Sequence, residues 1–408
     1  DTDSIRNIAL AGHSSSGKTS LAEAMLYTSG KTNRLGTVTD GTTKSDHTEA
    51  EIDRQISIST SVLHCAWNDT RINILDTPGY PDFVGDAKAG LWAVDAALIL
   101  INAASGVEVG TDKAWAFCRD YGRPVFFFIN HMGKEFANFE KVLGEMQEHF
   151  GRGIVPFHLP ANPGAGFNQI MDGQERRLLT YQLGGKGKAE EGSVPAELES
   201  QAGEMQERII EAAAESEDAL TEKYLEEGGL SEEEVSRGIK IGIANRTLFP
   251  VLCGDASGNI GADRLLDFLV AKAPAPLEVP PRKAHKPDSE ETIELAPKAE
   301  APMAAIVFKT ISESVGDLSF VRVVSGTLEA GGDAFNANLK ENERIGQVYL
   351  LNGKDKEEVE ALSPGDIGAL VKLKNTHTRD TLCAKNAPAI VSPYELPHPL
   401  IRIGMQPK

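Results

Sequence analysis

Residues 12–19 constrain the fold of this chain more than any other segment. They read Gly-His-Ser-Ser-Ser-Gly-Lys-Thr, the pattern of a phosphate-binding loop, between an apolar run at 8–11 and a helical pattern at 18–28. Gly12 and Gly17 let backbone N–H groups turn toward one point, where they and the start of the helix attract phosphate oxygens. We expect Lys18 to contact the β- and γ-phosphates and the Thr19 hydroxyl to bind Mg²⁺. The alternative is an ordinary glycine-containing turn between a strand and a helix.

A second segment predicts a site that responds to the phosphates. Residues 71–75 predict a strand that ends in Asp76-Thr77-Pro78-Gly79, and Asp76 comes 57 residues after Thr19. A carboxylate at the end of a strand beside the phosphate loop can hold Mg²⁺, and Gly79 places a flexible backbone N–H near the γ-phosphate. The segment could then move when that phosphate leaves. On their own, the same four residues also form a common turn.

The order of the predicted elements indicates how the chain is organised. Up to about residue 152, strands alternate with amphipathic helices, which implies a mostly parallel sheet with ligands at the carboxyl ends of its strands. The strands are expected at 8–11, 62–67, 72–75, 97–102 and 125–130, and the helices at 18–28, 83–94, 111–121 and 137–150. Residues 153–247 interrupt this pattern before a closing unit near 250–273. From residue 303 on, β-rich runs at 304–310, 318–324, 348–351 and 367–372 predict a closed antiparallel barrel.

Several short motifs along the chain match one known family. They are the phosphate loop with His13 after its first glycine, Arg-Gln-Ile-Ser-Ile-Ser at 54–59, Asp-Thr-Pro-Gly-Tyr at 76–80 with Asp82-Phe83, Pro-Val-Leu-Cys-Gly at 250–254, Ser-Gly-Thr-Leu at 325–328 and Leu-Ser-Pro-Gly-Asp at 362–366. Together they resemble elongation factor G, the translational GTPase of ribosomal translocation, over nearly the whole chain. Paralogues of that family with Tyr after the Asp-Thr-Pro-Gly sequence resemble the chain more closely.

The resemblance implies a domain plan. It predicts an α/β phosphate-loop GTPase domain with an α+β insert, followed by an antiparallel β-barrel domain. We expect the GTPase domain at 1–275 with its insert at 153–247, and the barrel at 301–400. Residues 276–300, which are rich in proline and charge, are expected to form a loosely ordered linker. Residues 401–408 are expected to begin a further domain, so that the chain is a fragment.

The resemblance also implies a site for GTP or GDP with Mg²⁺. The residues expected to bind the nucleotide are Gly12, Ser14, Ser15, Ser16, Gly17, Lys18, Thr19, Ser20, Asp76, Gly79, Asn130, His131 and Ala256. Mg²⁺ is expected on Thr19, Ser57 and Asp76, and catalytic roles are expected for Tyr80, Lys18 and His13. For His13, stabilisation of the loop is a simpler explanation than action as a base.

One departure from the family concerns the guanine base. The family reads guanine with Asn-Lys-x-Asp, whereas this chain has Asn130-His131-Met132-Gly133. The missing carboxylate normally accepts two hydrogen bonds from guanine, and charge-assisted bonds contribute roughly 1.5–3 kcal/mol each. We therefore expect guanine discrimination to be weaker by about a hundredfold or more, and Gly133→Asp to tighten GTP binding and leave ATP binding unaffected. Alternatively, Glu135 could swing in, or contacts from Asn130 and Ala256 could suffice.

Two further departures concern catalysis. Tyr80 occupies the position of the histidine that positions the attacking water in the family, and a phenol is a poor base although its hydroxyl can hold water. Ser57 replaces a threonine that binds Mg²⁺, which keeps the hydroxyl. Two functions remain open: a GTPase that acts on the ribosome, and a non-catalytic or very slow nucleotide-gated paralogue that binds the ribosome. A phosphate-loop ATPase is a remote third option.

Composition limits the partners and the compartment. The formal net charge of −19 argues against a general nucleic-acid-binding surface, and no apolar run is long enough to span a bilayer. Four cysteines without metal or redox spacing favour buried free thiols in a reducing compartment, so we expect a cytoplasmic protein. We also expect the protein to be a monomer. Residues 190–234 carry sixteen acidic and two basic residues above an apolar stripe of Leu198, Met205, Ile209 and Ile210. This acidic helix is either a solvated surface or, as the resemblance implies, a docking site for the ribosomal stalk protein.

Overall fold

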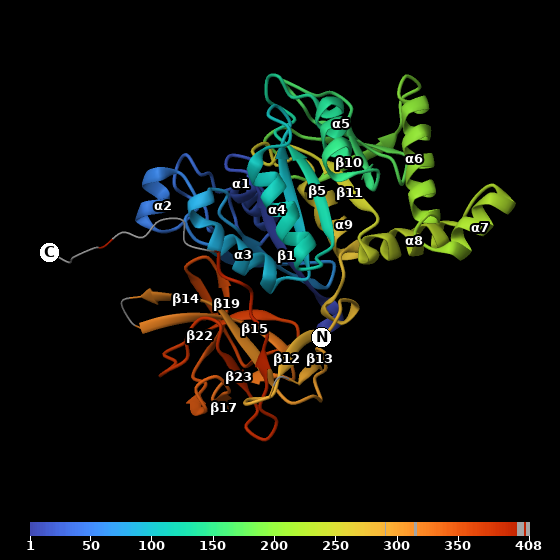
Figure 1. The fold of residues 1–408 in the computed structure, drawn as a ribbon. Helices are drawn as coiled ribbons and strands as arrows, with labels where there is room; N and C mark the ends of the chain where they lie inside the picture. Colours follow the sequence, from blue (N-terminus) through green and yellow to red (C-terminus); the bar gives the residue numbers. More distant parts are fainter. Residues whose placement is uncertain (290, 314–315, 398–403, 405–408) are drawn as a thin grey trace.

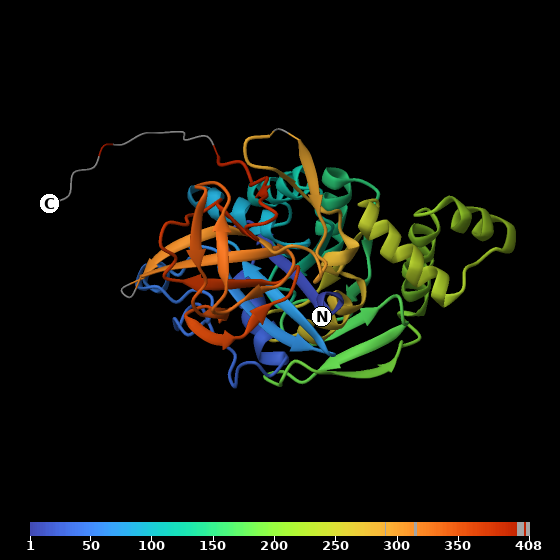
Figure 2. The ribbon, with the colours of Figure 1, turned by 90° about the horizontal axis from the view of Figure 1, so that it is seen from below.

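The computed structural model describes residues 1–289, 291–313, 316–397 and 404 of the chain. Two parts lie one above the other in Figure 1: an α/β domain that carries the N-terminus, and a β domain built from the last third of the chain. Three helices, α6 to α8, project to one side in both views of the ribbon (Figures 1 and 2). Within the described ranges, no helix combines the length and apolar character that crossing a bilayer requires.

A seven-stranded sheet forms the centre of the first domain. Its order is β2-β3-β1-β4-β5-β11-β6, and β2 alone among these strands runs antiparallel to its neighbour. The strands are β1 (Ile5–Gly12), β2 (Ser61–Trp67), β3 (Thr70–Asp76), β4 (Ala96–Asn102), β5 (Val125–Asn130), β6 (Ile154–Pro156) and β11 (Phe249–Cys253). Because parallel strands end at the same edge, the loops after β1, β3, β5 and β11 are brought together there.

Helices cover this sheet, and the positions of the predicted ones agree with the prediction to within two residues. Helix α1 has the predicted bounds, because its apolar side chains are buried at the predicted spacing. The helices of this part are α1 (Lys18–Thr28), α2 (Glu49–Arg54), α3 (Val84–Ala93), α4 (Val109–Asp120), α5 (Phe139–Phe150) and α9 (Ala262–Lys272). The short helix α2 was not predicted. The four cysteines are buried free thiols, as expected.

The insert combines a small sheet with three helices, as the α+β prediction requires. Its four-stranded sheet has the order β10-β9-β8-β7. The elements are β7 (His158–Pro160), β8 (Gln169–Asp172), β9 (Arg177–Tyr181), β10 (Ala189–Ser193), α6 (Glu199–Ala214), α7 (Asp218–Glu227) and α8 (Glu232–Asn245). Met205 and Ile209 of the predicted stripe are buried, and Leu198 and Ile210 pack partly buried against the same core. The acidic side chains therefore lie on the exposed side of α6.

The second domain is an antiparallel sheet of eight strands around its own apolar core. The order is β18-β17-β23-β14-β15-β22-β19-β20, with β16 (Leu328–Glu329) and β21 (Ala361–Leu362) paired beside it. The eight strands are β14 (Ala304–Glu313), β15 (Gly316–Ser325), β17 (Asp333–Asn336), β18 (Glu341–Arg344), β19 (Val348–Asn352), β20 (Asp355–Val359), β22 (Ile367–Val371) and β23 (Thr381–Cys383). The four predicted runs correspond to β14, β15, β19 and β22.

The segment between the domains differs from the prediction. Residues 276–300 contain a hairpin of β12 (Arg282–His285) and β13 (Thr292–Leu295), and β12 also pairs with β24 (Ile390–Val391). The sequence predicted a linker or a loosely ordered connection here, and the hairpin gives part of this segment regular structure. The proline and charged residues of this segment indicated little regular structure. Strand β12 is nevertheless ordered by pairing with β24, which is distant in the sequence. The further domain expected at 401–408 lies, apart from residue 404, outside the described residues.

Candidate nucleotide-binding site

Two glycines shape the phosphate loop. Gly12 ends β1 with a backbone φ of 134°, and a Cβ there would lie 2.5 Å from the carbonyl oxygen of Leu100. Gly17 precedes α1 with a φ of 88°, and a Cβ there would lie 2.2 Å from the side-chain nitrogen of Asn130. Glycine alone fits both positions, because other residues rarely adopt such φ values and a Cβ would overlap a neighbour. The loop therefore turns sharply into the N-terminus of α1, as phosphate binding requires.

Lys18 is buried against this loop. Its ammonium group donates to the carbonyl oxygen of His13 at 2.8 Å and to that of Gly12 at 3.3 Å. Burial lowers the pKa of Lys18 to about 8, and nearby carboxylates oppose this effect. A Cβ on Gly79 would lie 2.5 Å from the Lys18 Nζ atom. The segment after β3 thus passes directly against the ammonium group.

The side chains predicted to bind Mg²⁺ meet where β3 ends. The Thr19 hydroxyl donates to Asp76 Oδ2 at 2.7 Å and lies 3.1 Å from the Ser57 hydroxyl. Ser45 donates to the same Asp76 oxygen at 2.6 Å. Burial raises the pKa of Asp76, while its two hydroxyl donors act in the opposite direction. Residues 57 positions apart in the sequence therefore form one oxygen cluster.

Asp46 is a member of this cluster that the sequence did not single out. Burial, followed by repulsion from Asp76, raises the pKa of Asp46 to about 7. Within the described residues, one carboxylate oxygen of Asp46 and one of Asp76 are buried without a hydrogen-bond partner. Two such carboxylates beside two hydroxyls fit Mg²⁺, which takes one or two carboxylates and shares its remaining positions with phosphates and water. No short motif marks Asp46, because its place depends on the folding of residues 40–48 over β3.

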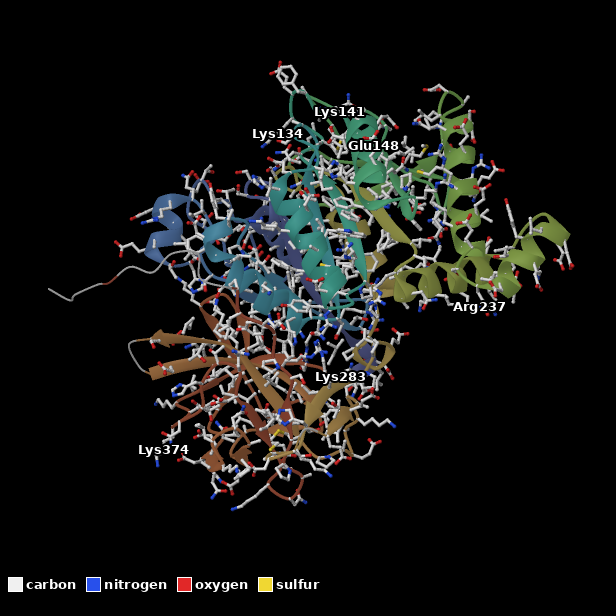
Figure 3. The ribbon with its side chains drawn as sticks, viewed as in Figure 1. Lys134, Lys141, Glu148, Arg237, Lys283 and Lys374 are labelled. Atoms are coloured by element: carbon white, nitrogen blue, oxygen red, sulfur yellow. The ribbon has the colours of Figure 1, made fainter. Side chains whose placement is uncertain are left out.

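An open cavity of about 340 Å³ lies over the phosphate loop. Of the predicted site residues it is lined by Ser14, Ser15, Gly17, Lys18, Thr19, Ser20, Ser57, Gly79, Tyr80 and His131. Val38, Thr39, Asp46, Gln55, Ile56, Lys134 and Ser257 complete the lining. Figure 3 places Lys134 on the loop that follows β5. Of the other predicted residues, Gly12 and His13 line a neighbouring pocket, Asp76 binds Thr19, and Asn130 binds Ser16 and Ala256.

Tyr80 stands between the cavity and a smaller apolar pocket. It lines both, together with Gly79, and its side chain is 38% exposed. His13 lines the smaller pocket, accepts a hydrogen bond from the Gly110 N–H at 3.2 Å through Nδ1, and faces Glu108 at 3.5 Å through Nε2. These contacts agree with a role for His13 in holding the loop to the start of α4.

The loops after β5 and β11 are tied to the phosphate loop. Asn130 donates to the Ser16 carbonyl oxygen at 2.9 Å and accepts from the Ala256 N–H at 2.9 Å. His131 has a φ of 68° and lines the cavity, and burial lowers the pKa of its imidazole. The Gly133 N–H donates to the Asp255 carboxylate at 3.0 Å. The Asn130 side chain therefore connects the phosphate loop to the loop after β11.

A buried glutamate holds the segment that carries Ser57. The Glu51 side chain accepts from the backbone N–H groups of Ile58 at 3.2 Å and Ser59 at 3.3 Å. Its other oxygen closes a capping box with Thr48 at the start of α2. The same carboxylate thus starts the helix and fixes the chain beyond it, which places Ser57 over Thr19.

The second domain also contacts this segment. The buried Lys309 of β14 donates to the Thr60 carbonyl oxygen at 2.7 Å, to Asp86 of α3 at 3.0 Å, and to the Ser59 hydroxyl. An exposed ion pair joins Lys44 to Asp355 of β20. The two domains are therefore connected through the residues on either side of Ser57.

Comparison with known proteins agrees with this architecture. Residues 3–275 match the family model of the elongation factor Tu GTP binding domain, and residues 302–385 match that of elongation factor G domain 2. A crystal structure of a protein from Thermus thermophilus is similar, with 28% identity and a TM-score of 0.84. The match covers 95% of this chain and 55% of that one, so this chain spans about half the length of that relative. The chain therefore belongs to the elongation factor Tu GTP-binding family, and its second domain matches elongation factor G domain 2.

Proposed function

We propose that the chain binds GTP with Mg²⁺ over the phosphate loop and that the protein hydrolyses this GTP on the ribosome. The observation that carries the proposal is the cluster of Thr19, Ser57, Asp46 and Asp76 beside the buried Lys18. Phosphoryl transfer depends mainly on positioning and on stabilising negative charge on the phosphates. A cation site and an ammonium group on the same loop meet that requirement.

The residues of the cluster would hold Mg²⁺, which supplies positive charge to the β- and γ-phosphates when it is bound. Lys18 would turn its ammonium group from the carbonyl oxygens of the loop to the same phosphates. Their negative charge would then raise the Lys18 pKa above the value of about 8 that burial sets. Position 79 has no room for a Cβ, so the Gly79 N–H could approach the γ-phosphate closely.

Tyr80 is the residue best placed to orient an attacking water. It lines the cavity next to Gly79 and is partly exposed to solvent. Its hydroxyl would position the water without acting as a base, while His13 holds the loop to Gly110. The second candidate function, a non-catalytic nucleotide-gated factor, is favoured by the same observation, because a phenol positions water but abstracts a proton poorly.

The partners and the compartment belong to the same proposal. We place the protein in the cytoplasm as a monomer that binds the ribosome, with no membrane or free nucleic acid as partner. The exposed acidic side of α6 would dock the stalk protein of the ribosome. The family assignment and the charge of −19 support this context.

Ribosome-stimulated hydrolysis tests the proposal and separates the two functions. We expect the full-length protein to hydrolyse GTP slowly alone and faster with ribosomes. Tyr80→Phe, which deletes only the hydroxyl, should cut the stimulated rate by about 10²-fold, and Tyr80→His should keep or raise it. Equal turnover of wild type and Tyr80→Phe would remove the catalytic role of the hydroxyl. No stimulation in any variant would favour the non-catalytic function.

A further inference from the structure

A buried carboxylate, that of Asp255, lies in the loop after β11, two residues before Ser257 of the cavity lining. Asp255 is 8% exposed and lies between Gly254, which follows β11, and Ala256, which Asn130 binds. Its neighbour across the two loops is Gly133, at a separation of 122 residues in the sequence. The cavity lining includes His131 and Ser257, which lie two residues from Gly133 and from Asp255.

The Asp255 carboxylate occupies the space that a side chain at position 133 would need. A Cβ built on Gly133 would lie 2.6 Å from Asp255 Oδ2, so the carboxylate would have to move to admit one. The Gly133 N–H donates to Oδ2 at 3.0 Å, and the Gly258 N–H donates to Oδ1 at 3.2 Å. The carboxylate keeps this position only with glycine at position 133, because any side chain there would displace it.

The Asp255 carboxylate keeps acceptor capacity for a ligand. An ionised carboxylate has about four acceptor positions, and the two backbone N–H groups use two of them. Both backbone bonds hold the carboxylate in one orientation, so little rotamer freedom is lost when a ligand binds. A fixed anionic acceptor selects a ligand edge that presents two adjacent N–H donors. Guanine presents such an edge at N1 and N2, whereas adenine presents an acceptor nitrogen at N1.

We infer that Asp255 is the residue that selects guanine in this chain, from the opposite loop to the one in which an acidic residue was expected. The inference rests on the proposed nucleotide site and names the base that this site takes. It replaces the expectation, drawn from Gly133 alone, that guanine is poorly discriminated. Asn130 and Ala256 then position the loop that carries Asp255.

Base analogues test this assignment on the wild-type full chain without any substitution. Equilibrium titrations with GDP, inosine diphosphate, xanthosine diphosphate and ADP vary only the edge that Asp255 would contact. GDP should bind most tightly, inosine diphosphate should lose about tenfold because it lacks the N2 amino group, and ADP should lose about a thousandfold. Similar affinities for GDP and ADP would overturn the assignment.

The variant Asp255→Asn tests whether Asp255, and not Glu135, contacts the base. The substitution keeps the shape and one acceptor oxygen but adds an N–H₂ donor, which suits the C2 carbonyl of xanthine in place of the guanine amino group. We expect the ratio of GDP to xanthosine diphosphate affinity to fall by at least about a hundredfold, while Glu140→Gln on exposed α5 leaves it unchanged. An unchanged ratio in Asp255→Asn, or the same fall in Glu135→Gln, would refute the role of Asp255.

The affinity ratios between nucleotides also show whether the base assignment to Asp255 fails or the nucleotide site itself fails. Lys18→Ala should weaken every nucleotide by a similar factor and leave the ratios intact, because it removes a phosphate contact. If no nucleotide binds the wild-type chain, the proposed function fails. If nucleotides bind with base ratios that ignore Asp255, the base assignment alone fails.

Discussion

Replacing Lys309 with methionine tests how the second domain is joined to the segment that carries Ser57. The Lys309 side chain is 8% exposed, and its ammonium group serves Thr60, Ser59 and Asp86 at once. Methionine keeps the apolar stem but removes the ammonium group, while Asp86 keeps the hydrogen bonds that Ser59 and the Thr60 N–H donate to it. Removing one partner of a buried ion pair costs about 3–5 kcal/mol, and the 33% exposure of Asp86 lets water recover part of this. We therefore expect about 2–3 kcal/mol of lost unfolding free energy.

The assay compares two cross-domain ion pairs that differ in burial. Lys44→Met breaks the exposed pair with Asp355, which should contribute at most about 1 kcal/mol. Urea unfolding of both variants gives the free energies. Trypsin cleavage after the exposed Arg54 reports how well the segment that carries Ser57 is held. Cleavage should be faster in Lys309→Met than in Lys44→Met. Equal urea midpoints and equal cleavage rates in the two variants would refute the argument that Lys309 couples the domains.

Three further substitutions probe the site. Gly133→Asp places a second carboxylate against Asp255, so it should weaken GDP binding or lower the unfolding free energy by about 2–4 kcal/mol. Tighter GDP binding, measured by calorimetry, would contradict this. Asp46→Asn should reduce the Mg²⁺ dependence of GTP binding by about tenfold in affinity, seen when titrations in Mg²⁺ and in chelator are compared. Glu51→Gln should lower the helix-capping stability by about 1 kcal/mol and speed cleavage after Arg54, and an unchanged cleavage rate would show that Glu51 does not fix the segment that carries Ser57.

Local patterns predicted β1 to β5 of the central sheet and four of the helices around it, α1, α3, α4 and α5, whereas β6 lies in the segment that was assigned to the insert. Strand β4 is almost entirely buried and α1 has a regular apolar spacing. The pattern of apolar residues in each segment was therefore enough to predict its secondary structure. The phosphate loop and Asp76 were found for a similar reason, because the chemistry of each lies within a short segment. Their meeting at one edge followed from the parallel order of the strands.

The features that were missed depend on partners far away in the sequence. Helix α2 has only six residues, which is too short for a clear apolar period, although its capping box is present in the sequence. Strands β12 and β13 have four residues each, of which only Ala284 is buried, so neither shows a clear apolar alternation. Strand β12 is held by β24, which lies about a hundred residues later in sequence. The proximity of Asp255 to Gly133 has the same origin, since no local pattern relates two loops from different strands.

Titration of the full-length protein with GTP in Mg²⁺, for wild type and Lys18→Ala, tests the central claim most directly. The Lys18 ammonium group is buried against the loop, and charge-assisted bonds to phosphates contribute roughly 1.5–3 kcal/mol each. We predict that wild type binds GTP and GDP and that Lys18→Ala, with unchanged circular dichroism, binds both at least about a hundredfold more weakly. Equal affinity of the two proteins for GTP and GDP would contradict the nucleotide site at the phosphate loop.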